Sequence, residues 1–350
     1  MFDSFATKKF ENRKFSSLNA RDLVDSNQVP NFKLDKEKKI ILISGPTGVG
    51  KSDFAEYLAG GLGTGAVILN CDMGQIYTPI SIGTSKPDDI SNCYLFNIVD
   101  EPLDFGVYAF RNMVLACLNK CWSEGKIPIL VGGSGFYIKS LFYPPISLDV
   151  NEKSDAEIIR EFENISTEDL YLRLQYIDPE RMQQIHQNDR YRIERALFLW
   201  KKTSYKPSAL KPTFEPIGSC FYYFLTRDKQ LLRNRIDERV SRMIDAGWLD
   251  EVRGLNDSWK KFLLRKKLIG YPDIIQYLKE GIDDQASLIK TIGYKTALYA
   301  KRQLTFWRSL QRQLIESDPD KHYIKDIQEF DLTNNFECLK DIIEKKINES

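Results

Sequence analysis

Short runs of consecutive apolar residues alternate with helical patterns in the first part of the chain. The runs cover residues 39–44 (K-I-I-L-I-S), 66–71 (A-V-I-L-N-C) and 127–131 (I-P-I-L-V). Apolar residues at helical spacing predict helices from Lys51 to Leu62 and from Val107 to Trp122. Because the strand runs lack polar alternation, they predict a buried parallel sheet of the kind found in α/β proteins.

The pattern changes after the two prolines at 144 and 145. From about residue 149 to residue 206 there is no strand-like run, and start signals of helices appear instead. Ser166 and Asp169 have the spacing of a capping box, and Asn188 precedes a second helical pattern as its candidate cap. A strand run returns at 220–225 (C-F-Y-Y-F-L), and helical patterns then continue to about residue 310.

These changes predict two domains and two tails. We expect an N-terminal tail at 1–37, an α/β core at 38–146 and 217–315, an all-helical insertion at 147–216, and a polar C-terminal tail at 316–350 that ends in one short amphipathic helix.

The composition excludes several classes of protein. With 42% hydrophobic and 28% charged residues the chain is an ordinary globular protein. No apolar run approaches the roughly 18 to 20 residues that a membrane span needs, and the N-terminus shows no signal-peptide pattern. None of the six cysteines forms a C-x-x-C pair, which argues against a zinc finger or a disulfide framework. We therefore expect a cytoplasmic monomer with reduced thiols and no membrane contact.

The charges are unevenly distributed although the net charge is only +1. Residues 181–310 hold 26 Lys and Arg against 14 Asp and Glu, a local net charge of +12. Such asymmetry favours a polyanionic partner for the basic region, although a solvated surface of mixed charge gives the same count.

A phosphate-binding motif follows the first strand run. Residues 45–52 (G-P-T-G-V-G-K-S) fit G-x-x-x-x-G-K-[ST] and lie between a predicted strand and a predicted helix. Glycines let successive N–H groups point at phosphate oxygens, Lys51 would neutralise the terminal phosphate, and the Ser52 hydroxyl would face Mg²⁺. The residues expected to bind the phosphates are Gly45, Thr47, Gly48, Val49, Gly50, Lys51 and Ser52.

The later strand 127–131 lacks a feature of most enzymes with this loop. Nucleotide hydrolases and kinases usually place an acidic residue at the end of such a strand to help hold the metal. Here the strand is followed by Gly132, Gly133, Ser134 and Gly135. This favours a diphosphate-ended ligand over a cycle of nucleotide hydrolysis.

Asp72 directly follows the second strand run. In a parallel sheet this position lies at the carboxyl edge, where ligands bind. A carboxylate there can hold Mg²⁺ through water, act as a general base, or simply cap the next turn of backbone.

Several segments in order resemble one family. They are residues 45–52, C-D-M-G-Q-I-Y at 71–77, I-G-T-S-K-P at 82–87, L-V-G-G-S-G-F-Y at 130–137, N-D-R-Y-R-I-E-R-A-L at 188–197, R-I-D-E-R-V at 235–240, I-G-Y at 269–271 and A-K-R-Q-L-T at 300–305. Together they resemble the tRNA dimethylallyltransferase (isopentenyltransferase) family, which implies a P-loop NTPase-like core.

The resemblance implies a reaction and its residues. The enzyme would transfer the dimethylallyl group of dimethylallyl diphosphate to the exocyclic amine of the adenosine 3′ of the tRNA anticodon. Asp72 would accept the amine's proton, while the loop, Mg²⁺ near Ser52, Ser134 and Arg239 with Arg235 beside it would stabilise the departing diphosphate. On a helix, Arg235, Arg239 and Arg242 also form one stripe, which would line a cleft or a solvated edge.

The resemblance also implies contacts with the anticodon stem-loop. Arg192 and Arg195 lie three residues apart on one predicted helix, and Tyr271 near Lys267 offers a stacking ring beside positive charge. The implied tRNA-binding residues are Met73, Gly74, Gln75, Tyr191, Arg192, Arg195, Lys267, Gly270 and Tyr271. Lys301 and Arg302 form either a further basic patch or part of a packed helix.

The chain departs from the family pattern at a few positions. Met73 stands where Ser usually follows the catalytic Asp, Ser134 replaces a usual Thr, and Phe306 with Trp307 reverses the common order. Three other functions stay open: a small-molecule kinase, which would turn over ATP; an isopentenyltransferase for free adenylate, which needs no extended RNA footprint; and an RNA-binding protein that has lost its donor site.

Overall fold

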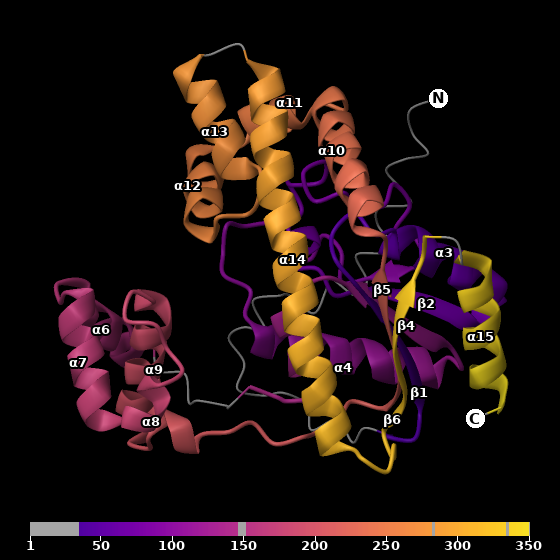
Figure 1. Cartoon of the computed structure of the whole chain (residues 1–350), viewed down its shortest axis with the longest axis horizontal. Coiled ribbons are helices and arrows are strands. Elements are labelled where there is room, and N and C mark those ends of the chain that lie inside the picture. The colour runs from indigo at the N-terminus through magenta and orange to yellow at the C-terminus, as the bar shows by residue number, and fades with distance from the viewer. Residues whose placement is uncertain (1–34, 146–151, 282–283, 334–335, 350) are drawn as a thin grey trace. The chain divides into compact units, whose positions relative to one another are not determined.

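The computed structural model describes residues 35–145, 152–281, 284–333 and 336–349. The chain divides into two compact units. Unit 1 contains Met1–Phe142 and Glu215–Ser350, and unit 2 contains Tyr143–Phe214. In Figure 1 unit 2 is the rose-coloured group of helices.

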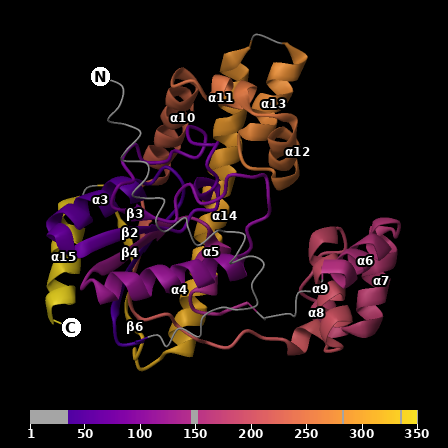
Figure 2. The ribbon, with the colours of Figure 1, turned by 180° about the vertical axis from the view of Figure 1, so that it is seen from behind.

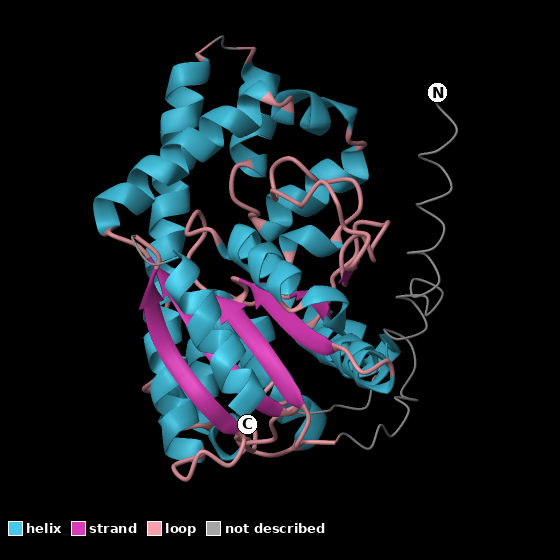
Figure 3. Ribbon diagram, turned by 90° about the vertical axis from the view of Figure 1, so that its right-hand side faces the viewer, coloured by secondary structure: helices cyan, strands magenta, loops and turns pink. Residues whose placement is uncertain are grey.

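In the residues that the structure describes, unit 1 is built on six parallel strands that form one sheet. The strands are β1 (Lys39–Ser44), β2 (Ala66–Asn70), β3 (Cys93–Tyr94), β4 (Ile127–Gly132), β5 (Ser219–Thr226) and β6 (Ile324–Asp331). Their order across the sheet is β3-β2-β4-β1-β5-β6, and every pairing is parallel (Figure 3). The predicted α/β fold with a P-loop NTPase-like sheet is confirmed.

Helices connect the strands of unit 1 (Figure 1). The helices are α3 (Lys51–Gly61), α4 (Val107–Ser123), α5 (Gly135–Ser140), α10 (Lys229–Asp245), α11 (Trp248–Gly254), α12 (Asp257–Lys266), α13 (Tyr271–Glu280), α14 (Gln285–Ser317) and α15 (Phe336–Glu349), with short 3₁₀ turns η1 (Gly63–Gly65) and η2 (Gly74–Ile76).

The apolar strand runs arise because both faces of the sheet are covered. On one face, Ile41 and Ile43 of β1 pack in a cluster with buried residues of α3 and α15, two helices that lie side by side in Figure 2. On the other face, Trp307 of α14 stacks on Phe224 of β5, with ring centroids 4.7 Å apart and planes parallel. Alternate residues of each strand thus enter different hydrophobic layers.

The predicted C-terminal tail is corrected, because β6 and α15 belong to the core of unit 1, and α15 is the short amphipathic helix expected at its end. β6 pairs with β5 along Cys220–Thr226, and Phe336 at the start of α15 packs edge-on against Phe54 of α3 at 5.2 Å. The pattern I-K-D-I-Q-E-F-D of β6 mixes polar and apolar residues because it is an edge strand with exposed positions. The two-residue strand β3 was also not predicted.

Unit 2 is all-helical in its described residues. Its elements are α6 (Glu152–Glu163), α7 (Thr167–Ile177), α8 (Pro179–Met182), α9 (Arg190–Thr203) and the 3₁₀ turn η3 (Pro207–Ala209). Leu170 and Leu174 of α7 meet Ile193 of α9 in a core of its own. The Ser166 Oγ accepts a hydrogen bond from Asp169 N at 3.0 Å, which confirms the predicted cap. Asp189, rather than the predicted Asn188, caps α9.

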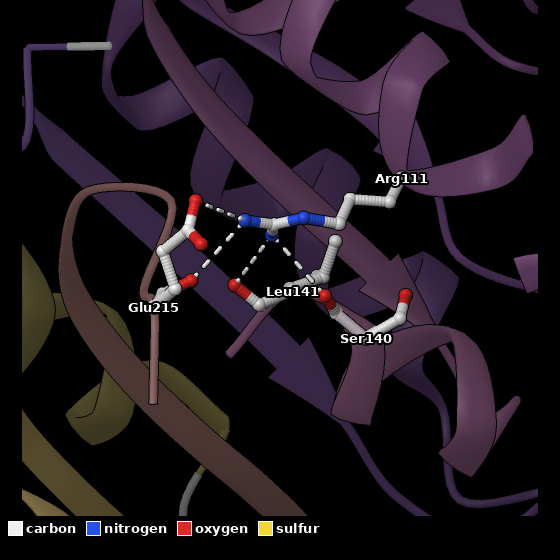
Figure 4. Close-up of polar contacts among 4 residues, drawn as sticks. All are labelled: Arg111, Ser140, Leu141 and Glu215. Carbon is white, nitrogen blue, oxygen red and sulfur yellow. Dashed lines mark hydrogen bonds and ion pairs between the residues drawn. The ribbon is translucent and has the colours of Figure 1, made fainter. Parts of the chain in front are cut away.

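A buried arginine joins the two segments of unit 1 between which the chain passes through unit 2 (Figure 4). Arg111 of α4 is 4% exposed. Its guanidinium donates to the Ser140 and Leu141 carbonyls, each at 3.1 Å, and to the carbonyl and carboxylate of Glu215 at 3.2 and 3.3 Å. A buried cation is tolerated here because its donors have partners, one of them an anion.

Within the described residues, none of the helices is both long enough and apolar enough to cross a membrane.

Candidate active site at the carboxyl edge of the sheet

Three loops that follow neighbouring strands meet at one edge of the sheet. β4 lies between β1 and β2, and all three strands point the same way. The loops after them contain residues 45–50, 133–134 and 71–73. The topology therefore brings the phosphate loop, Ser134 and Asp72 to the edge where parallel sheets bind ligands.

The phosphate loop has the backbone that its glycines allow. Gly50 has φ = 104°, a left-handed conformation that side chains disfavour, and α3 begins at the next residue, Lys51. The half-buried Lys51 Nζ donates to the Pro46 carbonyl at 3.0 Å, so its ammonium group folds back over the loop. The amino end of α3 and this ammonium group together favour an anion.

The pKa of Lys51 lies closer to neutral pH than that of a free lysine. Burial lowers its pKa to about 8, while the nearby Asp72 carboxylate acts in the opposite direction and Arg239 lowers it further. Asp72 also acts to raise the pKa of Arg239, which burial lowers. The Asp72 carboxylate thus opposes the effect of burial on the pKa of both cations.

Two arginines of α10 contact the phosphate loop. Arg239 Nη1 donates to the Thr47 hydroxyl at 3.1 Å, and Arg235 Nε donates to the Gly48 carbonyl at 3.0 Å. Arg235 also lies 3.9 Å from the carboxylate of Asp53. Arg242, the third member of the predicted stripe, is exposed. The stripe therefore divides into two residues at the loop and one at the surface.

Arg227 is a cation at this site that the sequence did not single out. It lies in the turn between β5 and α10, where its Nε donates to the Val49 carbonyl at 3.0 Å and its Nη1 to the Leu332 carbonyl at 3.1 Å. Burial lowers its pKa, and Arg235 nearby lowers it further. Leu332 directly follows β6. The Arg227 side chain therefore connects the C-terminal segment to the phosphate loop.

Asp72 is held in place by the last residue of β2. The fully buried Asn70 accepts from Asp72 N at 2.8 Å and donates to the Asp72 carbonyl at 3.0 Å. Asp72 Oδ1 accepts from Gly74 N at 2.9 Å, so the carboxylate also caps η2. Asp72 thus holds a turn of backbone and is at the same time close enough to Lys51 to affect its pKa. In the sequence, Asn70 could have been recognised as a polar residue near the end of an apolar run.

Ser134 links the loop after β4 to the loop after β2. Its Oγ accepts a hydrogen bond from Met73 N at 2.9 Å, and its backbone N–H donates to the Cys71 carbonyl at 3.3 Å. A hydroxyl that accepts one hydrogen bond can still donate its own hydrogen. Met73, which replaces the usual Ser, contributes this contact through its backbone, so the contact does not depend on its side chain.

The predicted Gln75 is fixed by a second loop. Its Nε2 donates to the carbonyls of Thr84 and Ser85 at 3.1 and 3.0 Å. That loop is held by Glu251 of α11, whose carboxylate accepts from the backbone N–H groups of Ser81 and Ile82, each at 2.7 Å. The sequence gave no reason to select Glu251, because its partners are 170 residues away in the chain.

The prediction that the Tyr271 ring is available to stack on RNA must be corrected. Tyr271 is 0% exposed, its hydroxyl donates to Glu251 at 2.8 Å, and its ring packs edge-on against Trp248. Gly270 (φ = 86°) is equally structural, because a β-carbon there would lie 2.1 Å from the Trp248 ring. Lys267 is exposed in a left-handed conformation at the end of α12. Of the three residues, only Lys267 offers a free surface to RNA.

The other predicted tRNA contacts lie in unit 2. Tyr191 is 77% exposed, and Arg192 and Arg195 are also exposed on α9. Arg195 lies over the Phe198 ring at 5.6 Å, and Arg192 pairs with Asp189 at 3.2 Å. These side chains form a basic and aromatic surface of the kind that binds phosphates and bases.

A metal at the phosphate loop would depend on the ligand. In the part of the chain that the structure describes, no group of three His, Cys, Asp or Glu side chains is arranged to hold an ion. Ser52 lies in the first turn of α3, directly after Lys51, and carries a hydroxyl oxygen. This sparse oxygen set fits Mg²⁺, which keeps several waters and binds substrate phosphates rather than a protein cage.

The pKa of Lys51 predicts how the affinity for a diphosphate changes with pH. An anion raises the pKa of the bound ammonium above its free value of about 8, so binding takes up a proton once the pH exceeds that value. We expect a constant affinity below about pH 8 and a fall of up to about tenfold per unit above it. Calorimetry with inorganic diphosphate measures this slope. The Lys51→Arg variant, charged throughout, should lack it; equal slopes in both proteins would contradict the assignment.

Comparison with known proteins gives a consistent result. The family model described as IPP transferase matches residues 75–310. The tRNA dimethylallyltransferase of Finegoldia magna is 35% identical over 87% of this chain and 99% of its own length. Another from Citrifermentans bemidjiense is 37% identical over 78% and 90%.

Two solved structures resemble the fold of this chain. The tRNA isopentenylpyrophosphate transferase of Bacillus halodurans superposes with a TM-score of 0.59 at 26% identity, covering 90% of this chain and 98% of that one. A eukaryotic dimethylallyltransferase acting on tRNA gives a TM-score of 0.68 at 25% identity, over 89% and 78%.

Proposed function

This chain belongs to the IPP transferase family, and from that membership we propose that it is a tRNA-modifying prenyltransferase with the residues described above as its active site. It transfers the dimethylallyl group from dimethylallyl diphosphate to the exocyclic amine of the adenosine 3′ of the anticodon in tRNA. The products are isopentenyladenosine in tRNA and diphosphate.

One observation carries the assignment of the site. β4 lies between β1 and β2 in the sheet, and Ser134, which follows β4, accepts a hydrogen bond from the backbone N–H of Met73, the residue after Asp72. The candidate base and the phosphate loop therefore share one edge of the sheet. This supports a displacement in which the base and the leaving group act on opposite sides of that carbon.

The transfer exchanges one bond for another. The adenine N6 lone pair forms a bond to C1 of the dimethylallyl group, the C1–O bond breaks, and its electron pair stays with the diphosphate. The proton of N6 passes to Asp72. Because negative charge grows on the bridging oxygen as the bond breaks, Lys51, Arg239 and the Ser134 hydroxyl stabilise it more in the transition state than before.

Ser52 would help to hold Mg²⁺ through its hydroxyl, and the ion would further neutralise the leaving diphosphate. The adenine must leave its stack to reach the site, at a cost of roughly a few kcal/mol that the RNA contacts have to offset. We assign those contacts to Gln75 and Lys267 in unit 1 and to Tyr191, Arg192 and Arg195 in unit 2.

Two rival enzymes make different demands on the same loop. A kinase for small molecules would need a metal-binding carboxylate after β4, where the chain has Gly133 and Ser134. An isopentenyltransferase for free adenylate would need no RNA surface, whereas Tyr191, Arg192 and Arg195 form an exposed basic and aromatic one on α9. The first observation argues against a kinase, and the second favours tRNA as the acceptor.

One assay separates these functions. The purified protein is incubated with Mg²⁺, dimethylallyl diphosphate and either unmodified tRNA or adenosine monophosphate, and the nucleosides are then weighed by mass spectrometry. Prenyl adenosine from tRNA alone is the expected result. A product from the mononucleotide alone would identify the adenylate enzyme, and no product from either would leave an RNA-binding protein without a working donor site.

A further inference from the structure

Gln303 of α14 joins two loops that follow neighbouring strands. Its Oε1 accepts a hydrogen bond from Thr47 N at 2.9 Å, and its Nε2 donates to the Gly133 carbonyl at 2.9 Å. The partners fix the orientation of the amide, because a backbone N–H only donates and a carbonyl only accepts. A side chain from a third element thus bridges the phosphate loop and the loop that carries Ser134.

The two hydrogen bonds of Gln303 connect the phosphate loop to a pair of loops that are already bonded to each other. The loops after β4 and β2 are bonded directly through the two contacts of Ser134 with Cys71 and Met73. Those contacts do not involve the phosphate loop. Gln303 supplies a direct connection between Thr47 and Gly133, and hence between the leaving-group site and the loop that holds Asp72.

The backbone that carries Gln303 is itself firmly placed. One turn further along α14, the buried Trp307 stacks on Phe224 of β5. Phe306 packs edge-on against Phe136 at 5.2 Å and lies against Gly135. At Gly133 a β-carbon would lie 2.4 Å from Gln303 Nε2, so the amide fits closely onto the loop. A shorter or apolar side chain at 303 cannot make both bonds from this backbone.

We propose that Gln303 is a positioning residue that sets the separation of Thr47 and Ser134, and thereby the grip of the site on a diphosphate. The inference rests on the proposed function, because both loops belong to the donor site. It also assigns the atoms of Thr47. The amide of Thr47 is bonded to Gln303, so the residue meets the diphosphate through its hydroxyl, the group that Arg239 contacts.

The test uses inorganic diphosphate with Mg²⁺ as the probe and the full-length protein. In Gln303→Met the Thr47 N–H and the Gly133 carbonyl lose their partner, and we expect the affinity for diphosphate to fall about tenfold. The affinity for the anticodon stem-loop should stay unchanged. Gln276→Met, at an exposed glutamine of α13, is the matched control and should bind diphosphate as the wild type does.

A double-mutant cycle distinguishes positioning from general support. If Gln303 acts by placing Ser134, then Ser134→Ala should lower diphosphate affinity much less in the Gln303→Met background than in the wild type. Effects that simply multiply, or an unchanged affinity in folded Gln303→Met, would overturn the proposal. Gln303→Asn, which keeps the amide but shortens its reach, replaces Gln303→Met in the cycle if that variant does not fold.

This experiment can fail independently of the proposed function. Diphosphate binding is measured without prenyl transfer. A wild-type protein that binds diphosphate but transfers no prenyl group refutes the proposed function. The double-mutant cycle on diphosphate binding still tests the role of Gln303 in that case. A protein that transfers prenyl groups normally in both Gln303 variants refutes the positioning role and leaves the function standing.

Discussion

Replacing Asp72 with Asn is expected to lower the turnover number of prenyl transfer by about 10²- to 10⁴-fold, the range in which general bases contribute. The amide oxygen can still accept the hydrogen bond from Gly74 N, so η2 keeps its cap. What is lost is the ability to take the proton from N6. Single-turnover measurements with saturating tRNA and donor would isolate this step.

Two controls make the result specific. The tRNA affinity of Asp72→Asn should stay within a few-fold of the wild type, which shows that the RNA surface is intact. Asp53→Asn removes a carboxylate beside the same loop, near Arg235, and should transfer prenyl groups at close to the wild-type rate. If Asp72→Asn retained activity, the proton would have to leave through another group.

Replacing Arg239 with Gln should lower kcat/KM for the donor by about 10²- to 10³-fold, as the loss of one preorganised donor at a developing oxyanion does in other enzymes. The guanidinium lies against the Thr47 hydroxyl and is charged at all working pH values. Its loss removes a cation from the place where the leaving diphosphate gains charge. Steady-state kinetics with varied donor concentration would measure the effect.

Arg242 provides the matched control for this prediction. It belongs to the same helix stripe as Arg239 but is exposed. Arg242→Gln changes the net charge of α10 by the same amount, so it should leave kcat/KM for the donor within about twofold, as surface substitutions usually do. Equal losses in the two variants would mean that the overall charge of α10, and not the contact of Arg239, matters.

The local features of the donor site could be predicted from the sequence. The phosphate loop needs glycines at fixed spacing and a lysine and a serine at the start of a helix, and all of these are adjacent in the chain. Asp72 could be placed because parallel strands end at one edge of a sheet, and its strand was a clear apolar run. β6 was missed because an edge strand keeps polar residues that resemble those of a tail.

By itself, the sequence determined the α/β fold, the phosphate loop and the position of Asp72 at the sheet edge, because each follows from residues that are close together along the chain. Only the tertiary structure decided which distant residues complete the site. Gln303 reaches Thr47 across 256 residues and Arg227 reaches Val49 across 178. Burial, likewise set by packing, turned Tyr271 from an expected RNA contact into a partner of Glu251. Hydrogen bonds and burial between distant segments depend on how helices pack, which spacing along a sequence does not encode.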